Sequence, residues 1–354
     1  MSNLLLKGVF VMEGSLIFKE GKPFKGIPLK KLKHFLTSMN LDYTDSIDYS
    51  VMYTLDDEIV ATGSLSSNIL VDFAIRDDLQ GESLSIKIIT ALLYKANKRG
   101  FKTLYIFTKP NNVKYFLQSS FYELVRTDDV ALLSNDKNII TKFTDAAKKG
   151  LGDLTSKTVG SIVMKADPFT LGHKYLVETA SPNCDVLLLF VVEKGKTYYD
   201  FETRFKLVES GVKDYSNVHV FRTSLFMVSP LTFPAYFYKG KTERQKAVSN
   251  IDLDLKIFSS HIAKNLNITK RFIGTEPYSE VTNLYNERMK ALLPNEGIEV
   301  FEIIRKINDK EYISATKVRK CFEDGNLDEI KAIVPLTTYK ELCEIINKRK
   351  RDES

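Results

Sequence analysis

Residues 161–180, with the sequence SIVMKADPFTLGHKYLVETA, join an apolar run to a knot of charged, hydroxyl-bearing and small residues, and then to a helical pattern. The apolar run that ends at Met164 predicts a buried strand, and the residues after Gly172 predict a helix. In open parallel sheets, ligands gather at the carboxyl ends of strands, where backbone amides and helix N-termini face outward. We therefore predict that residues 165–173, which are called the knot below, line a binding site.

The same alternation of strand and helix patterns continues beyond this stretch. Such β-α-β repetition predicts a parallel sheet of roughly five strands, doubly wound and Rossmann-like, with covering helices on its faces. Two further helical patterns complete the chain. Residues 229–248 fit neither period, and they predict either a lid over the site or an insertion that packs on the core. The predicted strands are 159–164, 185–192, 217–221, 270–274 and 297–304.

The first half of the chain has a different rhythm. Short strand patterns at 49–55, 58–65 and 68–75 predict an antiparallel meander, and a helix, a strand and a short helix follow them. A polar, lysine-rich stretch with two glycines separates this half from the next apolar strand. We predict an α+β domain at 1–140, a linker at 141–157 and the parallel-sheet domain at 158–354.

Composition bounds the class of protein. The chain has 354 residues, 44% of them hydrophobic and 27% charged, which is typical of two globular domains. No targeting segment or apolar run long enough to cross a bilayer is present, and the three cysteines have no CxxC spacing, so we predict a cytoplasmic protein with no membrane partner. The net charge of +6 favours anionic ligands, but the basic tail is typical of a solvated end and predicts no nucleic-acid partner.

The knot suits the binding of a polyphosphate. A helix that begins near Gly172 offers N–H groups and partial positive charge to an anion, and Gly172 permits close approach. Thr170 lies three residues before His173 in a TxGH pattern, so that both side chains can hydrogen-bond the same phosphate. An alternative interpretation is that Thr170 caps the helix and His173 is a surface side chain.

A second cluster with similar chemistry lies at 312–322, YISATKVRKCF. Ser314 and Thr316 begin a helical run, and Arg319 lies one turn into it, so this helix start also carries hydroxyls and a cation. The alternative is an N-cap at Ser314 followed by a solvated basic face. Because the two clusters follow the first and a late strand of one sheet, together they favour a nucleotide site.

These motifs resemble those of the nucleotidyltransferase superfamily that carries HxGH or TxGH together with ISSTxxR. Four segments, 159–180, 187–195, 232–239 and 272–289, are similar to the citrate lyase ligase family, and the resemblance spans about residues 158–320. That family also carries an N-terminal domain like the GNAT acetyltransferases, which residues 48–134 resemble. The resemblance implies a GNAT-like α+β domain followed by a nucleotidyltransferase domain.

The resemblance also implies a reaction. Acetate attacks the α-phosphate of ATP, pyrophosphate leaves, and the acetyl-adenylate is captured by the prosthetic-group thiol on the acyl carrier subunit of citrate lyase, with Mg²⁺ on the phosphates. No metal site built from protein side chains is expected, although Asp167 either orders the turn or helps to hold magnesium. The residues implied are His173, Thr170 and Arg319 as catalytic, and Lys165, Ala166, Phe169, Gly172, Gly274, Glu276, Ser314 and Thr316 as ATP-binding.

The N-terminal half resembles a domain that holds a pantetheine arm. The turn and helix start at 77–89, DDLQGESLSIKII, are similar to the CoA-binding turn of acetyltransferases, which implies contacts from Gln80, Gly81, Ser83 and Leu84. Ser83 stands where such turns usually have a second glycine, and this departure makes a tight amide cradle harder to form.

Two other functions remain open at this stage. One is a nucleotidyltransferase that adenylylates a phosphopantetheine-type acceptor and releases a stable product. The other is a non-catalytic module that senses nucleotide and acyl-CoA, which the departure at Ser83 suggests and the intact TxGH and ISATKVR motifs oppose. Acetate-dependent exchange between ATP and pyrophosphate distinguishes them from the ligase.

Overall fold

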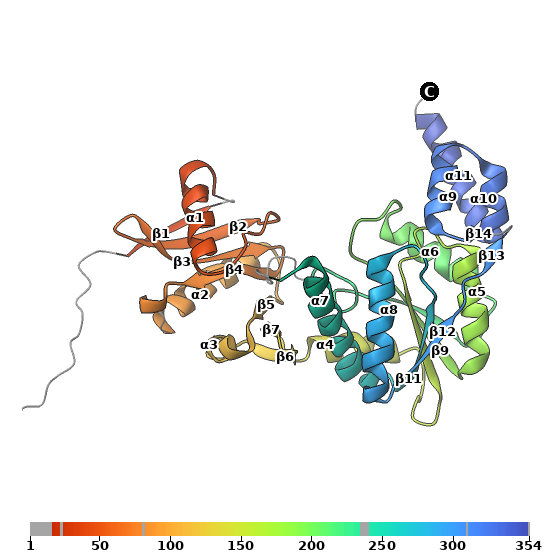
Figure 1. Ribbon diagram of the computed structural model, residues 1–354, viewed down its shortest axis with the longest axis horizontal. Helices are drawn as coiled ribbons and strands as arrows, with labels where there is room; N and C mark the ends of the chain where they lie inside the picture. The colour runs from red at the N-terminus through yellow and green to blue at the C-terminus, as the bar shows by residue number, and fades with distance from the viewer. Residues whose placement is uncertain (1–15, 22–23, 80–81, 234–240, 309–310, 353–354) are drawn as a thin grey trace, which may run out of the picture. The chain divides into compact units, whose positions relative to one another are not determined.

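The computed structural model describes residues 16–21, 24–79, 82–233, 241–308 and 311–352 (Figure 1). These residues form two compact units. The first contains the described residues up to Glu123 together with Leu132–Asp136, and the second contains Leu124–Ala131 and the described residues after Asp136. No helix in the described part of the chain is long and apolar enough to cross a membrane.

A mixed sheet organises the first unit, with the strand order β1-β2-β3-β4-β5-β7-β6. Strands β2, β3 and β4 pair antiparallel, as the strand patterns predict. Helix α2 then leads to β5, which pairs parallel with β4. The elements are β1 (Ile17–Gly21), α1 (Gly26–Ser38), β2 (Tyr49–Leu55), β3 (Glu58–Ser66), β4 (Ile69–Ile75), α2 (Glu82–Lys98), β5 (Tyr105–Thr108), α3 (Val113–Leu117), β6 (Tyr122–Arg126) and β7 (Ala131–Ser134).

The second unit is built on a five-stranded sheet with the order β10-β9-β8-β11-β12, and every neighbouring pair is parallel. Helices α7 and α8 lie on one side of this sheet and α5 lies on the other (Figure 1). The prediction of a doubly wound parallel sheet is therefore confirmed. The elements are α4 (Ile139–Lys148), β8 (Val159–Met164), α5 (Leu171–Ala180), β9 (Val186–Val191), α6 (Phe201–Val212), β10 (Val218–Arg222), α7 (Glu243–Ile257), β11 (Ile268–Gly274), α8 (Glu280–Leu292), β12 (Glu299–Ile303), α9 (Ala315–Glu323), α10 (Leu327–Ile333) and α11 (Leu336–Asp352).

Several features differ from the sequence-based expectation. Most of α4 falls within the predicted linker 141–157, for part of which a short helix was an open alternative, and its buried side chains form an amphipathic stripe that packs in the second unit. Three helices, rather than two, follow β12. Part of the predicted lid or insertion, 234–240, lies outside the described residues, and α7 begins just after it at Glu243. The domain boundaries at 140 and 158 stay a prediction.

A close contact between a ring and a glycine fixes the knot on the sheet core. Phe169 is fully buried among side chains of β8, β9, α5 and α6. A Cβ atom added at Gly211 of α6 would lie 2.4 Å from the Cε1 atom of this ring. Only a residue without a side chain therefore lets the Phe169 ring occupy its place below the knot.

We expect Gly211→Ala to destabilise the second unit by about 1–3 kcal/mol, since the added methyl group forces a fully buried ring out of a close-packed site. Urea unfolding followed by circular dichroism measures the loss. The matched control is Gly150→Ala, where the added Cβ atom has no neighbour within 4 Å. Equal unfolding midpoints for the Gly211 variant and the parent protein would show that the ring is not held by this contact.

Candidate functional site

The order of the strands creates a switch point in the second sheet. From β8 the chain passes outward to β9 and β10, and it then returns to place β11 on the opposite side of β8. Crevices at such switch points lie outside the carboxyl ends of the strands and bind ligands in open α/β sheets. Here the two strand ends are Met164 and Gly274, so the knot at 165–173 and the turn after Gly274 lie at the edge of the sheet where such a crevice is expected, and this place is called the crevice below.

Thr170 and His173 cap the helix that begins above this crevice. The Thr170 hydroxyl accepts a hydrogen bond from the backbone N–H of His173 at 3.3 Å. In return, the backbone N–H of Thr170 donates to Nδ1 of the His173 ring at 3.1 Å. This reciprocal arrangement is a capping box in which histidine replaces the usual glutamate or glutamine. Thr170 therefore caps the helix, and the same pair of hydrogen bonds fixes the orientation of the His173 ring.

The same hydrogen bonds define the protonation state of His173. Because Nδ1 accepts from Thr170, the proton of the neutral ring belongs on Nε2, where it is available to donate. Burial and, to a smaller extent, the positive charge of Arg305 together lower the pKa of His173 from 6.5 to about 4. His173 is consequently a neutral hydrogen-bond donor at physiological pH.

Two buried groups hold the backbone of the knot in shape. The Asp167 carboxylate, 6% exposed, accepts from the backbone N–H groups of Tyr198 at 2.8 Å and Tyr199 at 3.0 Å. The Arg204 guanidinium, which is fully buried, donates to the carbonyl oxygen of Lys165 at 2.5 Å. Asp167 therefore orders the turn by tying it to the loop after β9, and both of its oxygens are used in doing so.

Arg319 joins the two sequence motifs. Its Nη1 atom donates to the backbone carbonyl of Asp167 at 2.5 Å, and its Nη2 atom donates to the Thr316 hydroxyl at 2.9 Å. The motifs also touch through Gly172, because a Cβ atom added there would lie 3.3 Å from the carbonyl oxygen of Ile313. Residues about 150 positions apart in the chain thus form one cluster of hydroxyls and cations.

Ser314 is the N-cap of α9, where its hydroxyl accepts from the backbone N–H of Lys317 at 3.2 Å. This capping bond is the alternative that the sequence offered for Ser314, and it places the hydroxyl at the positive end of a helix dipole. Two capped helix N-termini, those of α5 and α9, therefore border the knot. Their charge and their first-turn amides suit an anion.

The third part of the crevice follows β11 and β12. Glu276, whose side chain is 8% exposed, accepts from the backbone N–H groups of Tyr278 and Ser279 and pairs with Arg305 at 2.6 Å. The stem of Arg305 lies next to Gly274, since a Cβ atom added there would meet Arg305 Cγ at 3.9 Å. Glu276 thereby fixes Arg305 close to the switch point, where its charge acts on His173.

The structure brings most of the sequence-predicted cluster together. Thr170, Gly172 and His173 are brought against Ser314, Thr316 and Arg319. Lys165 is exposed, whereas Ala166 and Phe169 are buried, at 1% and 0% exposure.

Two arginines near this site were not predicted from the sequence. Arg204 lies inside a predicted helix, and Arg305 lies just after a predicted strand. Neither belongs to a motif, and no spacing rule marks a single arginine that folds back on a distant carbonyl or carboxylate. Nothing short of the tertiary structure would have found them.

The predicted pantetheine contacts lie in the first unit. Gln80 and Gly81 fall outside the described residues. Ser83 is exposed near the start of α2, and Leu84 is buried on the inner face of that helix. Among the residues that the structure describes, no group of three or more His, Cys, Asp or Glu side chains could hold a metal ion.

We expect Arg305→Gln to raise the pKa of His173 above its native value of about 4, because a nearby positive charge that opposes ring protonation is removed. Titration of the ring protons by NMR, with His173 assigned by its own substitution, measures the change. Since the native pKa lies below 6.5, folded-state stability from this group falls as pH drops from about 6.5 towards 4. A midpoint that does not move in the variant would contradict the proximity of the two groups.

Comparison with known proteins agrees with this architecture. The family model for the citrate lyase ligase C-terminal domain matches residues 159–342. The chain is 34% identical to the [Citrate [pro-3S]-lyase] ligase of Klebsiella pneumoniae over 337 residues, which is 94% of this chain and 97% of the relative. It is 31% identical to the ligase of the same name from Escherichia coli strain K12, over 96% of this chain and 97% of the relative.

A solved structure, Thermotoga maritima TmcAL bound with alpha-thio ATP, matches with a TM-score of 0.36 at 15% identity, and the match covers 54% of this chain and 56% of that one. The family assignment is based on the sequence relatives, which match along almost their full length. Together with the family model, which covers the whole crevice from the TxGH knot to the ISATKVR helix, they establish that the chain belongs to the citrate lyase ligase family.

Proposed function

We propose that this chain is an AMP-forming ligase that activates acetate with ATP and transfers the acetyl group to the prosthetic-group thiol on the acyl carrier subunit of citrate lyase. The names of the relatives support a ligase that acts on citrate lyase. The observation that carries the adenylation step is the Arg319 bridge, because it unites two anion-binding helix starts at one switch point. We place this reaction in the cytoplasm.

In the first step an acetate oxygen attacks the α-phosphate of ATP and pyrophosphate leaves. His173 donates from Nε2 to an oxygen of the α-phosphate, where negative charge builds up in the transition state. Leu171 and Gly172 belong to the first turn of α5, whose N–H groups have no intrahelical acceptor and face the same phosphate. Thr170 holds the ring of His173 in the orientation that this contact requires.

The leaving pyrophosphate lies against the second motif. Arg319 is 28% exposed, and its planar guanidinium reaches phosphate oxygens while it keeps its bonds to the knot. The hydroxyls of Ser314 and Thr316 each accept one internal hydrogen bond and retain a proton to donate. Lys165, exposed at the end of β8, adds a further positive charge.

The nucleoside lies at the ends of β8 and β11. Ala166 and Phe169, which are 1% and 0% exposed, lie beneath it, and the backbone after Gly274 borders it. Glu276 acts here through Arg305, since its oxygens already have partners within the fold. Arg305 is then free to meet an anion near His173, either the α-phosphate or the incoming acetate.

Magnesium fits this site on the phosphates of the nucleotide. Within the described residues no group of three or more His, Cys, Asp or Glu side chains could hold it, and each oxygen of Asp167 accepts one backbone N–H and keeps a further lone pair. When bound, magnesium supplies charge neutralisation on the triphosphate. The protein residues need only to bind and orient the nucleotide and to exclude other geometries.

In the second step the thiol sulfur attacks the acetyl carbonyl carbon, and AMP leaves. We assign the thiol-bearing pantetheine arm to the first unit, at Gln80, Gly81, Ser83 and Leu84. The exposed position of Ser83 at the start of α2, next to the buried Leu84, supports this assignment because a helix start suits the phosphate of the arm.

We expect His173→Ala to lower acetate-dependent exchange between ATP and pyrophosphate by about 10²–10³-fold, the usual cost of removing a donor to developing negative charge. The exchange of radiolabelled pyrophosphate into ATP measures it. The matched control is His219→Ala, which removes a histidine from the middle of edge strand β10 in the same unit. Undiminished exchange in the His173 variant would remove this residue from the mechanism.

We expect Arg319→Lys to lower the same exchange by about 10–100-fold and to raise the KM for ATP, because lysine cannot keep the Asp167 carbonyl and the Thr316 hydroxyl and also meet a phosphate. Steady-state kinetics at varied ATP measure both changes. The control is Lys320→Arg, which is the reverse substitution one position further along the same helix. An unchanged KM for ATP would mean that Arg319 acts on the fold alone.

A further inference from the structure

Exposed apolar side chains of the second unit gather at one end of its sheet. Among the described residues of this unit, the large apolar side chains that are exposed belong to Tyr278, Val281, Ile304, Ile307 and Leu336. The first four, called the apolar patch below, come from the turn after β11, the first turn of α8 and the segment after β12, and they are between 53% and 71% exposed. Because exposed apolar residues usually occur singly on a protein surface, this concentration indicates a contact surface.

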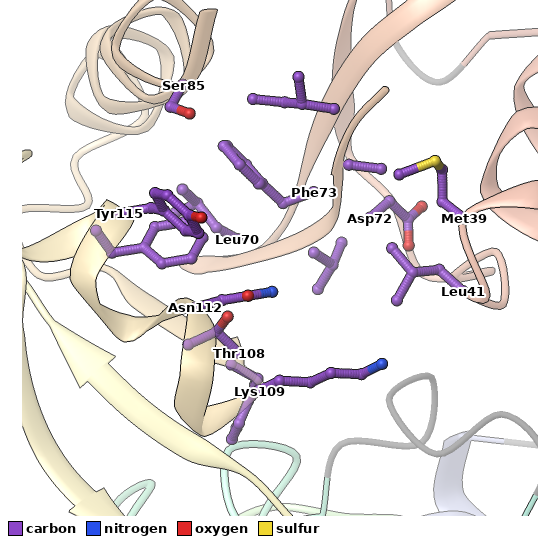
Figure 2. Close-up of a pocket in the computed structure, with 15 residues that line it drawn as sticks. Met39, Leu41, Leu70, Asp72, Phe73, Ser85, Thr108, Lys109, Asn112 and Tyr115 are labelled. Atoms are coloured by element: carbon purple, nitrogen blue, oxygen red, sulfur yellow. The ribbon is translucent and has the colours of Figure 1, made fainter. Parts of the chain in front are cut away.

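The described part of the first unit presents its exposed apolar side chains differently. They come from β1, α1, α2, α3 and β6. One of them, Tyr115 of α3, lines a pocket of about 170 Å³ together with Leu70 and Phe73 (Figure 2). Packing within the unit therefore accounts in part for the position of Tyr115, whereas the apolar patch lies on turns at the edge of a sheet.

Ring and strand contacts join the segments of the apolar patch. The rings of Tyr278 and Tyr312 lie edge to face, with their centroids 6.1 Å apart and their planes at 80°. Ile307 pairs with Tyr312 in a small antiparallel sheet of β13 (Ile307–Asn308) and β14 (Glu311–Tyr312). The turn after β11 and the segment after β12 are thereby held together as one surface.

The apolar patch continues into the crevice. Arg305, which lies close to the switch point, directly follows Ile304. The carbonyl oxygen of the next residue, Lys306, accepts from the backbone N–H of Ile313 at 3.2 Å, and the carbonyl of Ile313 lies against Gly172 of the knot. A protein that covers the patch therefore stands at the mouth of the crevice.

The charge within this surface is positive. Lys306 is exposed, and no carboxylate among the described residues forms an ion pair with it. Its ammonium group lies 5.7 Å from the centroid of the Tyr175 ring. The exposed carboxylate of Glu280 in α8 is paired with Arg244 at 3.6 Å. The surface consequently favours a partner that presents apolar side chains together with carboxylates.

We propose that the apolar patch and Lys306 form the docking surface for the acyl carrier subunit of citrate lyase during the thioester-forming step. This inference rests on the proposed function, in which a protein-bound thiol reaches an acetyl-adenylate in the crevice. A carrier must bind within reach of the crevice to deliver such a thiol, and the patch borders it. Apolar and aromatic contacts with charge at the rim are typical of protein–protein interfaces. The surface belongs wholly to the second unit.

The test uses the full-length protein with ATP, magnesium, radiolabelled acetate and deacetylated citrate lyase. In the double variant Ile304→Ser with Ile307→Ser, we expect the KM for the lyase in acetyl transfer to rise about tenfold, because apolar contacts at the centre of an interface carry much of its affinity. Acetate-dependent exchange of pyrophosphate into ATP needs no carrier and is expected to keep the parent rate. The matched control is Leu336→Ser, which removes an exposed apolar side chain of the same unit outside the patch. An unchanged KM for the lyase in the double variant overturns the proposal.

Reversal of the charge at Lys306 provides a second test that leaves the apolar side chains in place. In Lys306→Glu, we expect the KM for the lyase to rise about tenfold at low ionic strength and the difference to shrink as salt is added, since salt screens exposed charges. The matched control is Lys264→Glu, an exposed lysine just before β11 and therefore at the opposite end of the sheet. A KM that equals the parent value at low salt overturns the assignment of Lys306.

Other occupants of the apolar patch predict different results. If a second copy of this chain covers the patch, the parent protein sediments as a dimer and the double variant as a monomer. If another segment of the same chain covers it, the double variant loses thermal stability while its KM for the lyase stays unchanged. Either result overturns the proposal. Absence of acetate-dependent exchange in the parent protein would instead refute the proposed adenylation, so the two failures are distinguishable.

Discussion

The hydrogen bonds of Arg319 hold the candidate site together. One arm of the guanidinium binds the carbonyl oxygen of Asp167 in the knot after β8, and the other binds the hydroxyl of Thr316 on α9. The contact of Gly172 with the backbone at Ile313 and the packing of Leu171 against the cluster that contains Ile313 and Val318 add to this bridge. A fork of five fixed donors is suited to such a task, because it satisfies two distant acceptors at once and still presents charge to a ligand.

Two cations of the site, Arg204 and Arg319, bind backbone carbonyls more closely than carboxylates, whereas Arg305 pairs with the Glu276 carboxylate. Arg204 donates to the carbonyl of Lys165, and Arg319 lies 2.5 Å from the carbonyl of Asp167 but 3.8 Å from its carboxylate. The Asp167 carboxylate is itself bound by backbone amides. A positive charge that is anchored by neutral dipoles keeps much of its field, and the crevice therefore remains attractive to a polyphosphate.

The parallel sheet and the two motif-bearing helix starts could be predicted from the sequence, because apolar periodicity and capping residues are local signals. Other features depend on contacts between distant parts of the chain. Arg305 is positioned by its ion pair with Glu276, and the bulge in β4 arises from a register shift against β3, which no residue pattern in β4 reveals. The helix α4 was placed largely in a linker, since its apolar stripe is short and its surroundings are polar. Local patterns thus specify elements, whereas the charged groups that complete the sites depend on the assembled fold.

The neutral state of His173 limits what chemistry the crevice can perform. A ring with a pKa of about 4 has no proton to give as an acid at neutral pH, and its Nδ1 atom is already occupied by the amide of Thr170. What remains is an oriented Nε2–H group, which stabilises developing negative charge without moving a proton. Attack of a carboxylate on a phosphate with pyrophosphate as leaving group needs no proton transfer, since both nucleophile and leaving group are stable anions. In the proposed second step a thiol proton is released, and the proposal therefore requires a proton acceptor, solvent or side chain, other than His173.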